Sequence, residues 1–385
     1  MKTYEDLTLF TPGPVNVPAR VLAAGAKPML HHRTPEFSRI LSGLVEKAQS
    51  LLGTGQDILP VHTSGRGAME GTILNLFSSG DAIVSVCNGK FGEMYAEMAE
   101  KHGLKVYKVC EDWLCDANIA EIEAVLRSSP DVKAITVCQC ETTTATINDI
   151  QSIARLAKQY GKLILVDCIS SAGCLPLEFD AWQLDVVVTA SQKGLMSPAG
   201  LSLVVLSEAA WAAVDASKFP KFYIQFRDIQ KNMRGKNAET PGSTPVSLVA
   251  AVEEALSAIE QEGKENVYAR HATVARAIRA GVEAMGLTLF PKEVNRRSPA
   301  LTAFVVPEGL SSSGIRSALK QNFGIVTAGG LGSAYKDTVV RIGHMGSVYP
   351  KDAIMVIGAL EATMYKLGFV KEPGPGTAAC IRALG

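Results

Sequence analysis

The sequence has no long hydrophobic run, no excess of charge of one sign and no cysteine spacing typical of a metal site. No apolar stretch approaches the roughly 20 residues that span a membrane, and the amino terminus lacks the basic and apolar regions of a secretory signal. The 38 lysines and arginines balance the 38 aspartates and glutamates, so charge favours neither nucleic acid nor a membrane surface as a partner. We therefore expect a cytoplasmic protein without a metal site.

The cysteines are predicted to be buried thiols, because most lie in apolar stretches and no Cys-x-x-Cys pair or Cys/His ligand spacing occurs among them. They are Cys87, Cys110, Cys115, Cys138, Cys140, Cys168, Cys174 and Cys380.

The 385 residues are 47% hydrophobic and 20% charged, which is typical of an enzyme-sized globular chain with more than one domain. Between about residues 58 and 206, β-rich runs alternate with helical patterns, which predicts an α/β fold with a mostly parallel sheet. Strands are expected at residues 82–86, 105–109, 134–139, 163–166, 186–189 and 201–206. Helices are expected at residues 149–160, with Asn148 as N-cap, and at 246–262 and 267–285.

A smaller α/β unit is expected beyond about residue 287. It has predicted strands at 300–306 and 339–342, helices at 312–322 and 351–367, and a loose tail at 372–376. We accordingly expect an amino-terminal segment over residues 1–20, a large domain over 21–262 and a small carboxyl-terminal domain over 263–385.

Two side chains of opposite charge follow predicted strands. Asp167 comes directly after one buried run, and Lys193 follows the next run in the sequence Ser-Gln-Lys-Gly. Taken singly, each is typical of a loop residue, but ligands of open α/β sheets bind at the carboxyl ends of strands. A lysine and a carboxylate in one crevice suit pyridoxal 5'-phosphate, because the lysine forms a Schiff base and the carboxylate keeps the pyridine nitrogen protonated.

A phosphate site for such a cofactor is predicted in the sequence Thr-Ser-Gly-Arg-Gly-Ala-Met-Glu at residues 63–70. A Ser/Gly-rich turn that enters a helix offers free backbone N–H groups and the positive end of the helix dipole. The same turn is also typical of a simple helix cap. Its glycines do not match the G-x-G-x-x-G spacing of a Rossmann-type oxidoreductase, and no G-x-x-x-x-G-K-[ST] motif occurs.

These segments together resemble class V aminotransferases of fold type I, in the alanine-glyoxylate or serine-pyruvate aminotransferase branch. The resemblance covers nearly the whole chain. It rests on Thr-Pro-Gly-Pro at 11–14, Ser-Gly at 64–65, Val-Asp at 166–167, Ser-Gln-Lys at 191–193 and Val-Arg-Ile-Gly at 340–343.

The resemblance implies a role for each matching residue. Lys193 would be the Schiff-base lysine and Asp167 the partner of the pyridine nitrogen. The phosphate would be held by Ser64, Gly65, Arg66 and Gln192. Thr142 would contact the cofactor near its phenolic oxygen, and Phe91 would stack on the ring where relatives often carry tryptophan.

The resemblance also implies a homodimer with shared active sites, in which Thr240, Ser243 and Thr244 complete the phosphate site of the other subunit. The same segment is typical of a helix entry, because Pro245 suits a first helical turn. Arg341 would bind the substrate carboxylate through two parallel hydrogen bonds, and Arg33 is a further candidate for the substrate pocket.

The expected reaction moves an amino group from a small amino acid, alanine or serine, to a small 2-oxo acid, glyoxylate or pyruvate. The Glu-Thr-Thr-Thr sequence at 141–144 also resembles 2-aminoethylphosphonate-pyruvate aminotransferases. A cysteine desulfurase is disfavoured, since the expected small domain holds only Cys380.

Overall fold

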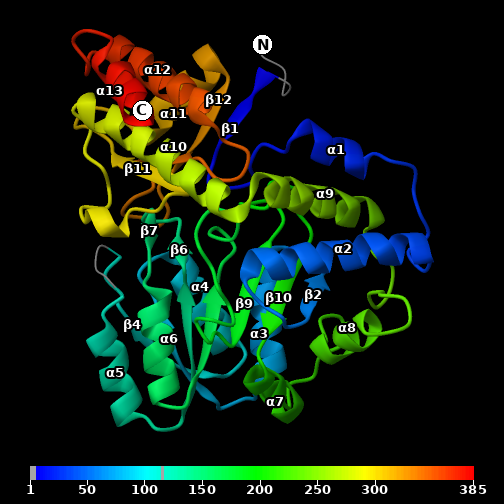
Figure 1. Cartoon of the computed structure of the whole chain (residues 1–385). Helices are drawn as coiled ribbons and strands as arrows, with labels where there is room; N and C mark the ends of the chain where they lie inside the picture. The colour runs from blue at the N-terminus through cyan, green and yellow to red at the C-terminus, as the bar shows by residue number, and fades with distance from the viewer. Residues whose placement is uncertain (1–5, 114–116) are drawn as a thin grey trace.

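Two sheets of unequal size organise the chain, which is described by a computed structural model over residues 6–113 and 117–385 (Figure 1). The larger sheet has the strand order β2-β10-β9-β8-β5-β3-β4, and the smaller has the order β1-β12-β13-β11. A short hairpin, β6 (Cys140–Glu141) with β7 (Thr146–Ile147), leaves the larger sheet towards the smaller one.

The large sheet is parallel apart from one strand, which confirms the mostly parallel sheet predicted from the sequence. Its strands are β2 (Ile58–Val61), β3 (Ala82–Val86), β4 (Lys105–Val109), β5 (Val132–Cys138), β8 (Leu163–Asp167), β9 (Val186–Ala190) and β10 (Ser202–Leu206). Only β10 runs antiparallel to its neighbours in this sheet. Apart from the partly exposed edge strand β4, the strands are mostly apolar because both faces of the sheet are buried, with Ile83 and Val84 packing into clusters on opposite sides.

Helices cover both faces of the large sheet (Figure 1). One face packs against α2 (Pro35–Leu52), α5 (Ile119–Ser128), α6 (Ile150–Gln159) and α9 (Val246–Glu262). The other packs against α3 (Gly65–Leu76), α4 (Lys90–Lys101), α7 (Glu208–Ala216) and α8 (Phe226–Met233). Helix α1 (Ala19–Gly25) lies along α9.

The small sheet takes one strand from the amino terminus. β1 (Thr8–Phe10) pairs with β12 (Ile325–Gly329), and β13 (Val339–Gly343) lies between β12 and β11 (Leu301–Val305). Helices α10 (Lys264–Ala284), α11 (Ser312–Phe323), α12 (Pro350–Lys366) and α13 (Pro375–Leu384) share one hydrophobic cluster with one face of this sheet. We propose that the smaller unit begins at Gly263, which lies between α9 and α10. This is the domain boundary expected from the sequence.

Two local expectations are wrong. The N-cap of α6 is Asp149, whose carboxylate accepts from the Ser152 N–H, while Asn148 bonds Asn88 instead. The predicted loose tail leads directly into helix α13, because Pro375 provides its first turn and its N-terminal amides are bonded by a buried glutamate of α12.

That glutamate is Glu361, which is only 3% exposed. Its Oε1 accepts from the Gly376 N–H at 2.6 Å, and its Oε2 accepts from the N–H and the hydroxyl of Thr377 at 3.1 and 2.6 Å. A carboxylate at a helix N-terminus also meets the positive end of the dipole. The contact therefore docks α13 against α12.

The cysteines within the described residues are buried, and Cys115 lies outside them. Over the same residues, none of the helices combines the length and the apolar character needed to cross a membrane.

We predict that Glu361→Gln lowers the free energy of unfolding by about 2 kcal/mol at neutral pH, because it removes charge-assisted hydrogen bonds. Burial alone raises the pKa of Glu361, but the Thr377 and Gly376 donors outweigh it and the pKa lies below the ordinary 4.5. The carboxylate's contribution is thus present above about pH 4.5 and lost as pH falls through the lower folded-state pKa. Urea unfolding of both proteins at about pH 7 and about pH 3 measures this; an equal gap at both pH values would contradict it.

Candidate active site

Asp167 and Lys193 line the same cavity, of about 260 Å³, at the carboxyl edge of the large sheet. Asp167 ends β8 and Lys193 follows β9, and these two strands are parallel neighbours. Neighbouring parallel strands deliver the residues after them to one edge. The structure therefore brings together the two charged side chains that the sequence placed 26 residues apart.

The Asp167 carboxylate is buried, with 6% of the residue exposed. Its Oδ1 accepts from the Ile169 N–H at 2.8 Å, and its Oδ2 accepts from the Cys138 thiol at 3.4 Å. Burial raises the pKa of Asp167, and the backbone donor and the Lys193 charge oppose that rise only in part. Such a carboxyl favours a cationic partner in the cavity.

The Lys193 amine donates to the carbonyl oxygen of Pro12. Burial lowers the pKa of Lys193, while the charge of Asp167 opposes the fall. A lysine with a lowered pKa is available as a neutral base or nucleophile.

Gly13 explains how the amino-terminal segment approaches this lysine so closely. Its φ is +119°, and a Cβ at this position would lie 2.5 Å from the Lys193 side chain. The Thr-Pro-Gly-Pro sequence thus packs directly over Lys193, a contact that its position near the amino terminus did not reveal.

The N-terminus of α3 forms one end of the cavity, where Ser64, Gly65 and Arg66 lie with Gln192. Ser64 is the N-cap, but its side chain makes no capping bond. The first amides of a helix have no partner within it, so this end suits an anion.

Gln192 Oε1, from a residue that lines the cavity, is buried without a hydrogen-bond partner among the described residues, and so is Oγ1 of Thr142, which does not itself line the cavity. A buried polar atom without a partner is costly unless a ligand supplies one. The Thr142 hydroxyl, the α3 N-terminus and the Asp167–Lys193 pair fit a planar, phosphorylated and electrophilic group.

Phe91 is half-buried at the start of α4 and lines the cavity. Sequence reasoning missed the remaining lining residues, which are Met69, Met94, Cys140, Ile169 and Ser170. None of them belongs to a motif, so only the fold could reveal them. Burial raises the pKa of the Cys140 thiol to about 12, which keeps it protonated.

Arg341 lies on β13 and is 6% exposed. Its Nε donates to the Gly329 carbonyl at 2.7 Å, and its Nη1 donates to the Thr142 carbonyl at 2.9 Å. Burial lowers the pKa of Arg341 to about 10, opposed by the charge of Glu141, so it remains a cation near neutrality. A guanidinium has five N–H groups, so others on Nη1 and Nη2 are left for a carboxylate.

Six predicted residues are not among those that line this cavity: Thr142 and Arg341, which are bonded to each other, and the four described next. Arg33 forms an ion pair with Glu239. The Thr240 and Thr244 hydroxyls bond each other at 2.6 Å, Thr240 lines a different cavity, and Ser243 is exposed.

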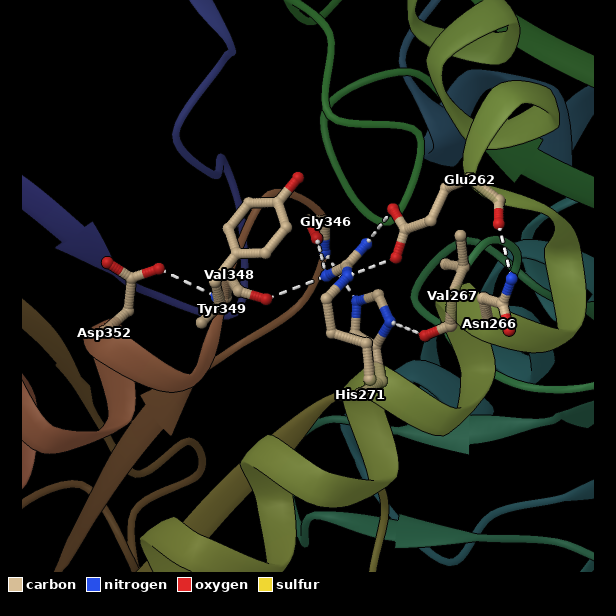
Figure 2. A network of polar contacts seen from close by, with 9 residues as sticks. Glu262, Asn266, Val267, His271, Gly346, Val348, Tyr349 and Asp352 are labelled. Atoms are coloured by element: carbon tan, nitrogen blue, oxygen red, sulfur yellow. Dashed lines mark hydrogen bonds and ion pairs between the residues drawn. The ribbon is translucent and has the colours of Figure 1, made fainter. Parts of the chain in front are cut away.

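Figure 2 shows how the turn after β13 is fastened to α10. Arg270 donates through Nη1 to the Gly346 and Val348 carbonyls, and its Nε and Nη2 form a two-bond pair with Glu262. His271 Nε2 accepts from the Gly346 N–H at 3.0 Å. Burial lowers the pKa of His271 to about 4, so the ring stays a neutral acceptor. The strand that carries Arg341 is thereby held at its carboxyl end.

The chain is similar in sequence to known proteins over most of its length. Residues 9–348 match the family model for class-V aminotransferases. The chain is 38% identical to the small subunit of a soluble hydrogenase from Synechococcus sp. strain PCC 6716, over 98% of both chains. It is 32% identical to a serine–glyoxylate aminotransferase from Methylorubrum extorquens, over 96% of this chain and 94% of that one.

Among solved structures, an alanine–glyoxylate aminotransferase from Nostoc sp. superposes with a TM-score of 0.88 at 27% identity, over 93% of this chain and 95% of that one. The family match spans both sheets and all the residues that line the cavity, and the resemblance seen in the sequence is confirmed. The chain belongs to the class V aminotransferase family, whose members use pyridoxal 5'-phosphate.

Proposed function

We propose that this protein transfers the amino group of a small amino acid, alanine or serine, to a small 2-oxo acid, glyoxylate or pyruvate. The observation that carries the proposal is the convergence of Asp167 and Lys193 in one cavity. Relatives named as serine–glyoxylate and alanine–glyoxylate aminotransferases support the choice of substrates.

Bound pyridoxal 5'-phosphate would supply an electron-accepting ring that stabilises negative charge at the substrate α-carbon. Lys193 would hold the cofactor covalently through Nζ, and the N-terminus of α3 with Ser64 and Arg66 would hold its phosphate. The Thr142 hydroxyl, whose Oγ1 lacks a partner in the chain itself, would donate to the cofactor. Phe91 would stack on the ring.

The protein's own residues would then move the protons. Asp167 would hold a proton on the ring nitrogen, because its buried carboxylate is stabilised by a cation. Lys193, once released, would take the α-proton at Nζ, which its lowered pKa favours. Arg341 would orient the substrate by its carboxylate, so that the α-proton faces Lys193.

A 2-aminoethylphosphonate donor is the alternative, since it is suggested by the Glu-Thr-Thr-Thr sequence. It would need additional positive charge at the cavity. Arg33, the residue considered for that role, is paired with Glu239. Small carboxylate donors therefore receive the stronger support.

We also propose a homodimer with shared active sites. Thr240, Ser243 and Thr244 do not reach the cavity of their own chain, and the nearby Phe222 is 93% exposed. A large exposed aromatic side chain is typical of an interaction surface. In the dimer, the segment would complete the phosphate site of the partner.

The donor is identified by adding alanine, serine, aspartate or 2-aminoethylphosphonate singly to the cofactor-loaded protein. We expect alanine or serine to convert the bound cofactor to its amine form, seen as loss of the yellow absorption. Glyoxylate or pyruvate should then restore it. Conversion by 2-aminoethylphosphonate alone would favour the alternative donor.

We predict that Lys193→Ala abolishes amino transfer, with a loss of at least about 10³-fold, because both the covalent attachment and the base are removed. Borohydride should fix the cofactor to the wild-type chain, as measured by intact mass, and not to the variant. Covalent fixation in the variant would assign the attachment to another residue.

Arg341→Lys should raise KM for the amino donor by about tenfold or more, since a lysine cannot donate two parallel hydrogen bonds to a carboxylate. Arg279→Lys is the matched control: Arg279 is another arginine whose pKa burial lowers to about 10, and it donates to the Ser298 carbonyl. Steady-state kinetics of both variants test the role, and an equal rise of KM in the two would contradict it.

Shared sites predict that two inactive variants restore activity when mixed. Lys193→Ala removes the base, and Ser243→Asp places a negative charge where the partner's phosphate would lie. Random exchange of subunits should recover up to about 25% of wild-type activity, because half of the dimers are hybrids with one intact site. Absence of recovery in hybrids isolated with two affinity tags would argue against shared sites.

A further inference from the structure

Glu141 is the most completely enclosed carboxylate beside the candidate site, with 0% of the residue exposed. Its Oε2 accepts from the N–H groups of Phe91 and Gly92 at 3.0 and 3.2 Å. Its Oε1 accepts from the Thr143 N–H at 2.9 Å. One side chain thus holds the start of α4 and the turn after β6.

Each of these two segments carries a residue to which the proposed function assigns a contact with the cofactor. Phe91 lines the cavity, and Thr142, next to Glu141 in the chain, accepts the Arg341 Nη1 bond through its carbonyl. Gly89 shows how tightly α4 closes on the carboxylate, because a Cβ there would lie 2.2 Å from the Glu141 carboxyl carbon. The placement of Phe91, Thr142 and Arg341 therefore depends on one group.

The charge of Glu141 also acts beyond its hydrogen bonds. Burial raises the pKa of Glu141, and the Thr143, Gly92 and Phe91 donors oppose that rise. The carboxylate in turn opposes the loss of charge on buried Arg341. Two buried charges of opposite sign compensate each other where neither is fully solvated.

We propose that Glu141 is a positioning residue that sets the cofactor-facing placement of Phe91 and Thr142 and supports Arg341. This inference rests on the proposed function and extends it to a residue that touches neither cofactor nor substrate. It gives a role to Glu141, the first residue of the Glu-Thr-Thr-Thr sequence at 141–144.

The decisive change is Glu141→Gln, which preserves shape. An amide keeps one oxygen acceptor but turns the other oxygen into a donor, which must face a backbone N–H. Glu361→Gln is the matched control. Both glutamates are buried, the carboxylate of each lies at the N-terminus of another helix, and each accepts two hydrogen bonds on Oε2 and one on Oε1. Glu361 serves α13, away from the cavity.

The measurement is the dissociation constant of pyridoxal 5'-phosphate for each apoprotein by equilibrium dialysis, with the urea midpoint of unfolding alongside. We expect Glu141→Gln to raise the dissociation constant by about tenfold and to raise KM for the amino donor. Glu361→Gln should lower the unfolding midpoint and leave the dissociation constant unchanged.

Three results separate the possibilities. If Glu141→Gln lowers the midpoint but binds the cofactor as tightly as the wild type, the positioning role is overturned and the proposed function stands. If the wild type binds no pyridoxal 5'-phosphate, the proposed function fails. If Glu141→Gln does not fold, Glu141→Asp keeps the charge and shortens the reach, and unchanged cofactor affinity in that variant would overturn the inference.

Discussion

Burial of opposite charges at one edge of a sheet is the constraint on which the rest of the structure depends. Asp167 and Lys193 each lie where an isolated charge is costly, and each shifts the pKa of the other towards its charged form. Parallel pairing of β8 with β9 keeps the two side chains at the same edge. The seven-stranded sheet and its two helical layers supply the rigid support for that pairing.

A second pair of buried charges repeats the arrangement at the boundary with the small sheet. Glu141 comes from the hairpin that follows β5, and Arg341 comes from β13. The Thr142 carbonyl joins them through the Arg341 Nη1 bond. Residues almost two hundred positions apart thus meet beside the cavity, and the network in Figure 2 fixes the far end of the Arg341 strand.

The first described residues of the chain contact both the small sheet and Lys193. β1 adds a strand to the small sheet, and the segment that follows crosses over Lys193 with its Pro12 carbonyl accepting from the amine. The cavity itself is lined by residues between Ser64 and Lys193, and the first residues of the chain pack over one of them, Lys193.

The sequence by itself predicted most of the large sheet. Six of its seven strands were expected, β2 being missed, and helix 246–262 was predicted with its observed bounds, because such patterns depend on neighbours along the chain. Asp167 and Lys193 could be paired because strand ends follow a general rule. The prediction of a loose tail around Pro375 was wrong, because proline and glycine are common both at the start of a helix and in an irregular segment.

Only the tertiary structure decided which distant groups share partners. Glu141 accepts from the N–H groups of Phe91 and Gly92, the Pro12 carbonyl accepts from Lys193, and Glu361 binds the N-terminus of α13. The spacing of these residues in the sequence does not predict such contacts. Whether a glutamate is solvated or enclosed depends on segments that arrive from elsewhere in the chain. The physical reason is that periodicity reports which face of an element is buried, whereas hydrogen-bond partners and pKa values follow from what is packed against that face.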